Sequence, residues 1–282
     1  MVNAFEPHGS DVPGGTDDEW TLRFRTLKPD EVPAPILDEL SGKSTTPDPV
    51  APELVWRNEL GGQTWRLGDQ YLKWSPHAAA IDLGREMERL RWLEGRHPAP
   101  RVLSSGDDTA GQWMLTAALD ADTAVSDFWR AHPEPAVRAI AEGLRRLHAL
   151  PVTEVPSHWE SWASRTPPEL GPRPPVEHPV LVHGDACSPN TLVDAEGRFA
   201  ANVDVGDLAV GDRWADLAVG AMSLEWNYGP GWDGLFYEVY GVKPDPARIV
   251  TTAPSGGPSP DLRTGPKPEV PPIRFSRQCR DL

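Results

Sequence analysis

Apolar and polar residues form short runs near residue 50 and then change to a helical period. The runs Leu54 to Glu59, Gln63 to Leu67 and Gln70 to Trp74 have the length of strands and are separated by glycine-containing turns. This pattern predicts a group of antiparallel strands. From Ala78 to Gly95 the apolar residues recur every three or four positions, which predicts an amphipathic helix directly after the strands.

The pattern continues with one strand, a long helix and a hairpin. Gln112 to Ala118 is an apolar run that predicts a buried strand leading into a connector. Pro135 to Leu150 is the clearest helix, because prolines stand at its start and Pro151 closes it. Thr191 to Val193 and Phe199 to Val205 flank an Asp-Ala-Glu-Gly turn, which predicts a β-hairpin.

The two ends of the chain have a different composition. Residues 1–20 are polar and rich in glycine and aspartate, which is typical of a disordered leader. Residues 151–178 are rich in proline and are interpreted as an insert. Residues 251–282 contain seven prolines and no helical period. The abrupt change at Thr251 favours a frameshift, and a natural proline-rich tail is the alternative.

The segment from His183 to Asn190, together with Asp204, contains the candidate catalytic and metal-binding residues. Asp185 and Asn190 stand five positions apart, the interval of the aspartate and asparagine in a kinase catalytic loop. The predicted hairpin places Asp204 about 7 Å from Asn190 by cross-strand geometry. Oxygen ligands of this kind suit Mg²⁺. Each residue alone has an ordinary explanation, a turn or a solvated carboxylate, but the combination predicts phosphoryl transfer. His183 is predicted to be structural.

These residues resemble the aminoglycoside phosphotransferase family. The resemblance rests on His183-Gly184-Asp185 to Asn190, on Val203-Asp204-Val205-Gly206, and on Gly211-Asp212-Arg213-Trp214-Ala215-Asp216-Leu217-Ala218. It implies an α+β, bilobal protein-kinase-like fold, with a small β-rich N-terminal lobe and a mainly helical C-terminal lobe. It also implies phosphorylation of antibiotic hydroxyls by MgATP. Asp185 is then the catalytic aspartate, Asn190 and Asp204 hold magnesium, and Asp216 supports the loop.

The resemblance also implies an ATP site in the first lobe. Lys73, on the third strand, would contact the ATP phosphates. Glu86 stands in a Glu-x-x-Arg-Leu-x-Trp-Leu pattern and would pair with Lys73, although a surface glutamate in an i,i+4 pair is the alternative. The backbone from Thr116 to Ala118 would bind adenine. The expected division is a leader at 1–20, an N-terminal lobe and hinge at 21–118, a catalytic lobe at 119–250 and the tail at 251–282.

The net charge of the chain limits the kinds of molecule that it is expected to bind. A formal charge of −15 argues against a nucleic-acid partner and is compatible with a cationic small molecule such as an aminoglycoside. Glu160 and Glu225 are the acidic residues expected to contact that substrate. No apolar run is long enough to span a bilayer, and no signal peptide is recognisable. We therefore expect a cytoplasmic enzyme without a membrane or obligate protein partner.

Three alternatives remain open from sequence. The same pattern serves kinases of other small alcohols, including macrolide, choline, homoserine and sugar-amine kinases. The altered C-terminus is compatible with a catalytically impaired nucleotide-binding protein. A metal-dependent hydrolase using His183 and Asp185 is disfavoured, because no second histidine-rich cluster accompanies them. The acceptor hydroxyl, the choice of ATP or GTP and the oligomeric state are not determined by the sequence.

Overall fold

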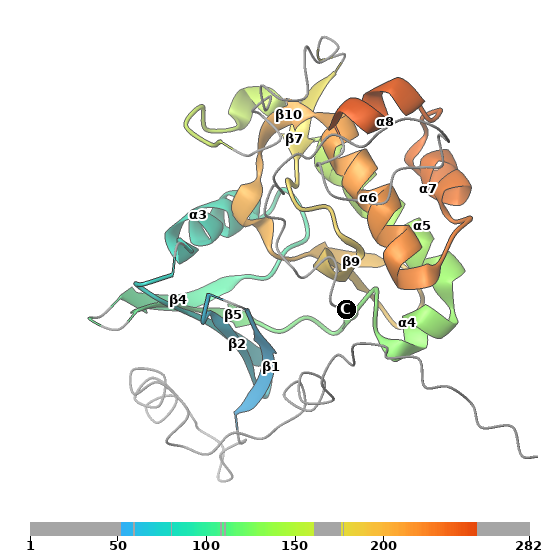
Figure 1. The fold of residues 1–282 in the computed structure, drawn as a ribbon. Helices are drawn as coiled ribbons and strands as arrows, with labels where there is room; N and C mark the ends of the chain where they lie inside the picture. Colours follow the sequence, from blue (N-terminus) through green and yellow to red (C-terminus); the bar gives the residue numbers. More distant parts are fainter. Residues whose placement is uncertain are drawn as a thin grey trace, which may run out of the picture.

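The computed structural model describes residues 52–252, apart from positions 59, 80, 108, 110, 161–175 and 177. The predicted leader, most of the proline-rich insert and the tail beyond Thr252 lie outside the described residues. Two regions are visible in Figure 1, a sheet with one helix and a larger region of helices with short strands. No helix in the described part is long and apolar enough to cross a membrane.

The first region is a five-stranded antiparallel sheet in the order β1-β2-β3-β5-β4. Its strands are β1 (Glu53–Arg57), β2 (Gln63–Leu67), β3 (Gln70–Pro76), β4 (Val102–Asp107) and β5 (Gly111–Ala117). β1, β2, β3 and β5 agree with the predicted runs to within two residues, whereas β4 was not predicted. Trp65, Leu72 and Leu115 form its core. Lys73 lies on the central strand β3, opposite Thr64 of β2 and Met114 of β5, so a rigid element holds its backbone.

The helix α3 (Leu83–Leu93) follows β3 and begins five residues later than predicted. A turn closed by the Ala79 N–H and the Pro76 carbonyl precedes it. The Asp82 carboxylate then accepts from the Gly84 N–H and caps the helix. This is a typical N-terminal cap. One face of α3, which includes Glu86 and Arg89, is buried.

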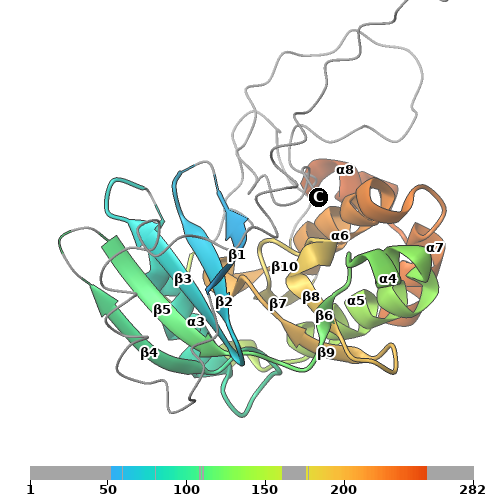
Figure 2. The same cartoon turned by 90° about the horizontal axis from the view of Figure 1, so that it is seen from below.

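The second region is mainly helical and lies to the right of the sheet in Figures 1 and 2. Its core contains Ile140, Trp214 and Phe236 from three different helices. The helices are α4 (Asp127–Ala131), α5 (Pro133–His148), α6 (Arg213–Tyr228), α7 (Asp233–Tyr240) and α8 (Pro246–Thr252). The short elements are β6 (Asp122–Thr123), η2 (Val152–Glu154), β7 (Pro179–Val182), η5 (Ser188–Asn190), β8 (Thr191–Val193), β9 (Phe199–Asn202), η6 (Val205–Asp207) and β10 (Ala209–Asp212).

The predicted hairpin is present, but its second strand ends early. β8 and β9 pair antiparallel, with Thr191 opposite Asn202. The prediction that this strand continues to Val205 is wrong, because Asp204 adopts left-handed backbone angles (φ 56°, ψ 45°) and η6 begins at the next residue. Asp204 is the one non-glycine residue with a positive φ in the described part of the chain. Because β9 ends at Asn202, the direction of the Asp204 side chain is not set by the alternation of side chains along a strand.

One hydrophobic cluster joins the two regions. It contains Leu90 and Leu93 of α3, Leu147 of α5, and Val205 and Leu208 around η6. α3 therefore packs against the C-terminal region as well as against the sheet. The α+β class and the order of a β-rich and a mainly helical lobe agree with expectation.

Candidate functional site

The strand β7 delivers the catalytic-loop motif. After Val182 the chain leaves β7 through His183 and Gly184, and it re-enters regular structure at η5. The Asn190 Nδ2 donates to two oxygens of Asp185, the backbone carbonyl at 2.9 Å and the side-chain Oδ2 at 3.1 Å. The spacing of five residues thus brings the predicted catalytic aspartate and the predicted magnesium ligand into direct contact.

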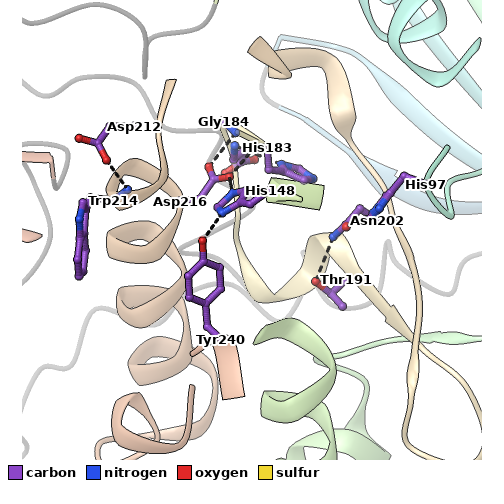
Figure 3. Close-up of polar contacts among 11 residues, drawn as sticks. His97, His148, His183, Gly184, Thr191, Asn202, Asp212, Trp214, Asp216 and Tyr240 are labelled. Atoms are coloured by element: carbon purple, nitrogen blue, oxygen red, sulfur yellow. Dashed lines mark hydrogen bonds and ion pairs between the residues drawn. The ribbon is translucent and has the colours of Figure 1, made fainter. Parts of the chain in front are cut away.

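Asp216 supports this loop from the first turn of α6. Its side chain is fully buried and accepts from the backbone N–H of His183 and, at 3.0 Å, from that of Gly184. Its Oδ2 also lies 2.9 Å from Nε2 of His148, whose Nδ1 lies 2.8 Å from the Tyr240 hydroxyl (Figure 3). A carboxylate only accepts, so Nε2 of His148 carries the proton. The predicted supporting role of Asp216 is confirmed, and His148 is a packed residue that holds Asp216 in place.

The His183 ring holds the loop against the hairpin. Its Nδ1 accepts from the Asp185 N–H at 3.3 Å, so its Nε2 donates to the Val203 carbonyl at 3.0 Å. The Val203 N–H in turn donates to the Asn190 carbonyl at 3.0 Å. These bonds place the segments that carry Asp185, Asn190 and Asp204 side by side, and they confirm the predicted structural role of His183.

Gly184 occupies a position that only glycine fits. Its φ is +83°, and a Cβ added there would lie 2.5 Å from the Asp207 carbonyl oxygen. The contact is to backbone, so a flexible side chain cannot move aside. Gly184 therefore allows the catalytic loop to pack closely against η6.

Replacing Gly184 with alanine is expected to destabilise the fold and to lower activity. The left-handed backbone alone costs an alanine about 1–2 kcal/mol, and the clash with Asp207 adds to it. A thermal melt of Gly184→Ala should show a clearly lower Tm than the wild type. The matched control is Gly234→Ala, because an added Cβ at Gly234 meets nothing within 4 Å. Equal melting temperatures for all three proteins would contradict the packing described here.

Lys73, Glu86 and Asp204 meet between the sheet and the catalytic loop. The Lys73 Nζ lies 2.7 Å from the Glu86 Oε1 and also contacts the Asp204 Oδ1. Glu86 is buried on the inner face of α3, so the alternative of a surface i,i+4 pair is excluded. The pairing of Glu86 with Lys73 is confirmed, and their contact with a nucleotide stays a prediction.

Charge is unevenly balanced in this cluster. Burial lowers the pKa of Lys73, but attraction by Asp204 and Glu86 outweighs burial and leaves the pKa above its usual value. Burial raises the pKa of Glu86, and Lys73 opposes that rise. One ammonium group therefore faces two carboxyl groups, which suits the approach of a further cation.

The donor set fits magnesium bound together with phosphates. Asn190 and Asp204 offer an amide and a carboxylate oxygen from adjoining ends of the hairpin. Mg²⁺ is usually held by one or two carboxylates plus substrate phosphates and water rather than by an all-protein cage. Within residues 52–252, as far as described, no group of three or more His, Cys, Asp or Glu side chains could hold a metal alone. The Asn190 and Asp204 oxygens are a donor set of the kind that holds Mg²⁺ together with phosphates.

The predicted adenine-binding backbone lies at the end of β5. Thr116 pairs with Tyr71 and Val102 in the sheet. The Ala118 N–H donates to the Asp69 carbonyl at 2.8 Å. In this conformation that N–H is engaged within the protein, so an adenine contact by Ala118 would use its carbonyl oxygen. The nucleotide contacts of Thr116 and Ala118 stay predictions.

The two acidic residues predicted to contact substrate lie on different elements. Glu160 is exposed, and its carbonyl accepts from the Arg85 Nη2 at 2.9 Å, beside α3. Glu225 is exposed on α6. Their roles in substrate binding stay predictions.

A buried polar pair near the site was not predicted. His97, just after α3, and Asn202, at the end of β9, are 6% and 2% exposed, and the His97 Nε2 lies 2.9 Å from the Asn202 Oδ1. The Asn202 Nδ2 approaches the Asn190 carbonyl at 3.4 Å and the Thr191 hydroxyl (Figure 3). The only local signal was a histidine next to Pro98, which does not reveal a partner 105 positions away.

Protonation of His97 is expected to destabilise the protein at acid pH. Burial lowers the pKa of His97 to about 4, against about 6.5 in an unfolded chain. The unfolded state binds the proton first, so stability falls as the pH drops from 6.5 towards 4, by about 3 kcal/mol in total. Urea unfolding at pH 7.5 and 4.5 should show a larger acid loss for the wild type than for His97→Gln. The exposed His77→Gln is the control and should behave like the wild type.

Comparison with known proteins gives consistent matches. The model of the phosphotransferase enzyme family matches residues 56–170 and 158–249. The chain is 35% identical over 205 residues to an aminoglycoside 3'-phosphotransferase of Streptomyces fradiae, over 60% of this chain and 76% of that protein. It is 30% identical over 262 residues to a streptomycin 3''-kinase of Streptomyces griseus, over 72% and 93%.

A solved structure agrees with the fold. A crystal structure of an aminoglycoside-3'-phosphotransferase of type VIII aligns with a TM-score of 0.60 and 25% identity, over 77% of this chain and 95% of that one. The predicted protein-kinase-like arrangement of the two lobes is thereby confirmed.

Proposed function

Because the chain belongs to the phosphotransferase enzyme family, we propose that it transfers the γ-phosphate of MgATP to a hydroxyl group of an aminoglycoside antibiotic. The observation that carries this proposal is the meeting of Lys73, Glu86 and Asp204 beside the Asp185–Asn190 contact. A phosphoryl-transfer site needs a cation for the phosphates, oxygen ligands for magnesium and a carboxylate for the acceptor hydroxyl. Residues of all three kinds are present in the described part of this chain, namely Lys73, the Asn190 and Asp204 oxygens, and Asp185.

The residues have separate roles in the proposed reaction. Lys73, held by Glu86, binds the nucleotide phosphates. Asn190 and Asp204 would hold Mg²⁺, which supplies neutralisation of the phosphate charge when bound. Asp185 orients the acceptor hydroxyl and takes its proton as the new oxygen–phosphorus bond forms and ADP leaves. Such catalysis consists mainly of positioning and electrostatic stabilisation.

The acceptor class rests on the relatives and on charge. Proteins similar to this chain are named as phosphotransferases of aminoglycosides and as a streptomycin kinase. The net charge of −15 favours a polycationic acceptor. Use of ATP favours a cytoplasmic location, and we propose that the enzyme acts there. Glu160 and Glu225 are the proposed substrate contacts, and Thr116 with Ala118 the proposed adenine-binding backbone.

The test is ADP release by the purified full-length chain. Reactions contain ATP with or without Mg²⁺, and one member of a panel of aminoglycosides, choline or homoserine. We expect release that requires both Mg²⁺ and an aminoglycoside, with the product gaining the mass of one phosphate. Release with choline or homoserine alone would identify another small-alcohol kinase. Binding of MgATP without release by any acceptor would identify a catalytically impaired protein.

A further inference from the structure

The helix α3 contacts the C-terminal lobe through a buried guanidinium. Arg89 is only 2% exposed. Its Nε donates to the Leu208 carbonyl at 3.0 Å, its Nη1 donates to the Arg85 carbonyl at 3.1 Å, and its Cζ lies 4.8 Å from the centre of a Trp159 ring. One side chain therefore connects α3, the residue after η6 and the segment that follows α5.

The surroundings of this guanidinium are unusual for a buried charge. Its described partners are carbonyl oxygens and an aromatic ring rather than a carboxylate. Burial lowers the pKa of Arg89 and repulsion by Arg85 lowers it further, while the charges of Asp207, Glu88 and Asp82 act in the opposite direction. An arginine remains charged at neutral pH. An apolar side chain of similar volume would pack there without that cost. Filling this space therefore does not by itself require an arginine, and what the arginine adds is its hydrogen bonds to the two carbonyl groups.

The geometry that Arg89 fixes lies next to the nucleotide site. Glu86 precedes it by three residues on the same face of α3. Leu208 follows η6, whose preceding residue is Asp204. A Cβ added to Gly206 would lie 3.7 Å from the Glu86 side chain, so η6 is in near contact with α3. The bond from Arg89 to Leu208 thus ties the helix that carries Glu86 to the turn that carries Asp204.

The Trp159 ring that covers the guanidinium is itself in contact with a second tryptophan, Trp92. Trp159 is buried and meets Trp92 edge to face, with ring centres 5.5 Å apart. The Trp92 Nε1 donates to the Glu154 carbonyl at 3.1 Å. Both rings belong to a contact between α3 and residues 152–160. This contact excludes water from Arg89 and strengthens its hydrogen bonds.

We propose that Arg89 is a positioning residue for the MgATP site. It holds α3 against η6, so that the Glu86 and Asp204 carboxylates meet at the Lys73 ammonium and Asp204 stays aligned with Asn190. Arg89 touches neither substrate, and it acts through the residues that do. The expected effects on MgATP kinetics rest on the proposed function. The expected loosening of the contact between α3 and η6 does not depend on it.

The kinetic test compares three variants in the full-length protein. Arg89→Met keeps roughly the side-chain volume and removes the charge. Arg89→Lys keeps the charge but loses the planar set of N–H donors of the guanidinium. Arg91→Met is the control, because it changes an exposed arginine of the same helix. For Arg89→Met we expect kcat/KM for MgATP to fall and the half-saturating Mg²⁺ concentration to rise, each by about 10–100-fold, as for lost outer contacts of a metal site. KM for the aminoglycoside should change by less than about 2-fold.

The remaining variants and a chemical rescue distinguish positioning from mere packing. Arg89→Lys should fall between the wild type and Arg89→Met, and Arg91→Met should match the wild type. Guanidinium at tens of millimolar, below denaturing concentrations, should restore part of the lost activity to Arg89→Ala but none to Arg89→Met, where the side chain fills the space. A lower Tm with unchanged Mg²⁺ dependence and no rescue would overturn the proposal. If Arg89→Met fails to fold, Arg89→Lys and the rescue decide.

A measurement without turnover separates this inference from the proposed function. Hydrogen exchange of the amides of residues 205–208 and the affinity for MgADP are measured in the wild type and Arg89→Lys. We expect faster exchange and weaker MgADP binding in the variant. Absence of transfer by the wild type to every acceptor would end the proposed function and leave this comparison valid. Equal exchange and equal MgADP affinity would overturn the role of Arg89.

Discussion

Asp204→Asn is expected to lower turnover by more than about 10³-fold while the protein remains folded. Asparagine tolerates the left-handed backbone that Asp204 adopts (φ 56°, ψ 45°), so the change removes mainly the negative charge. Without that charge the proposed magnesium site would lose its carboxylate ligand, and Lys73 loses one of its two anionic partners. Steady-state ADP release and a thermal melt measure the two parts of this prediction.

The matched control for this change is Asp207→Asn. Asp207 lies in the same turn, its side chain is 46% exposed and it pairs with Arg85 on the surface. An exposed pair of this kind contributes little to stability. We expect near wild-type turnover for Asp207→Asn. If Asp204→Asn is folded and turns over at the wild-type rate, Asp204 is not a magnesium ligand.

Asp185→Asn is expected to lower kcat by about 10²–10⁴-fold, the range for loss of a general base. The amide keeps the shape of the side chain and still accepts from the Asn190 Nδ2, which lies 3.1 Å from the Asp185 Oδ2. What it loses is the ability to take the acceptor proton. KM for MgATP should change little, because the phosphates are bound by other residues.

The control here is Asp107→Asn, an exposed aspartate at the end of β4. It should leave kcat unchanged. If Asp185 and Asp204 act in one reaction as proposed, the double variant Asp185→Asn/Asp204→Asn should lose far less than the product of the two single losses. Losses that multiply would mean that the two aspartates act independently.

Local patterns predicted the parts of the site that depend on short stretches of chain. The spacing of Asp185 and Asn190 and the hairpin after them are set by a few neighbouring residues, and both appear in the structure. The start of α3 was predicted too early, because Asp82 was not recognised as the cap. The end of β9 was predicted too late, because a left-handed residue inside an apolar run leaves no signal in the hydrophobic pattern.

Contacts between distant residues were beyond the reach of local patterns. Arg89 and Leu208 are 119 positions apart, and His97 and Asn202 are 105 positions apart. Helical periodicity placed the Arg89 helix but could not say which lobe its polar face would meet. The lobe boundaries at 118/119 and 250/251, and the frameshift proposed for the tail, stay predictions, because they depend on residues beyond the described part or on the gene itself.

The packing of α3 has a consequence for how the molecule opens. By sequence this helix belongs to the first lobe, yet it has more contact with η6 than with β4 or β5. Arg89 and the Trp92–Trp159 pair add to that attachment. If the sheet β1–β5 moves relative to the helical lobe, α3 is expected to stay with the helical lobe. The Lys73–Glu86 ion pair would then be the contact that such an opening breaks and a closing remakes.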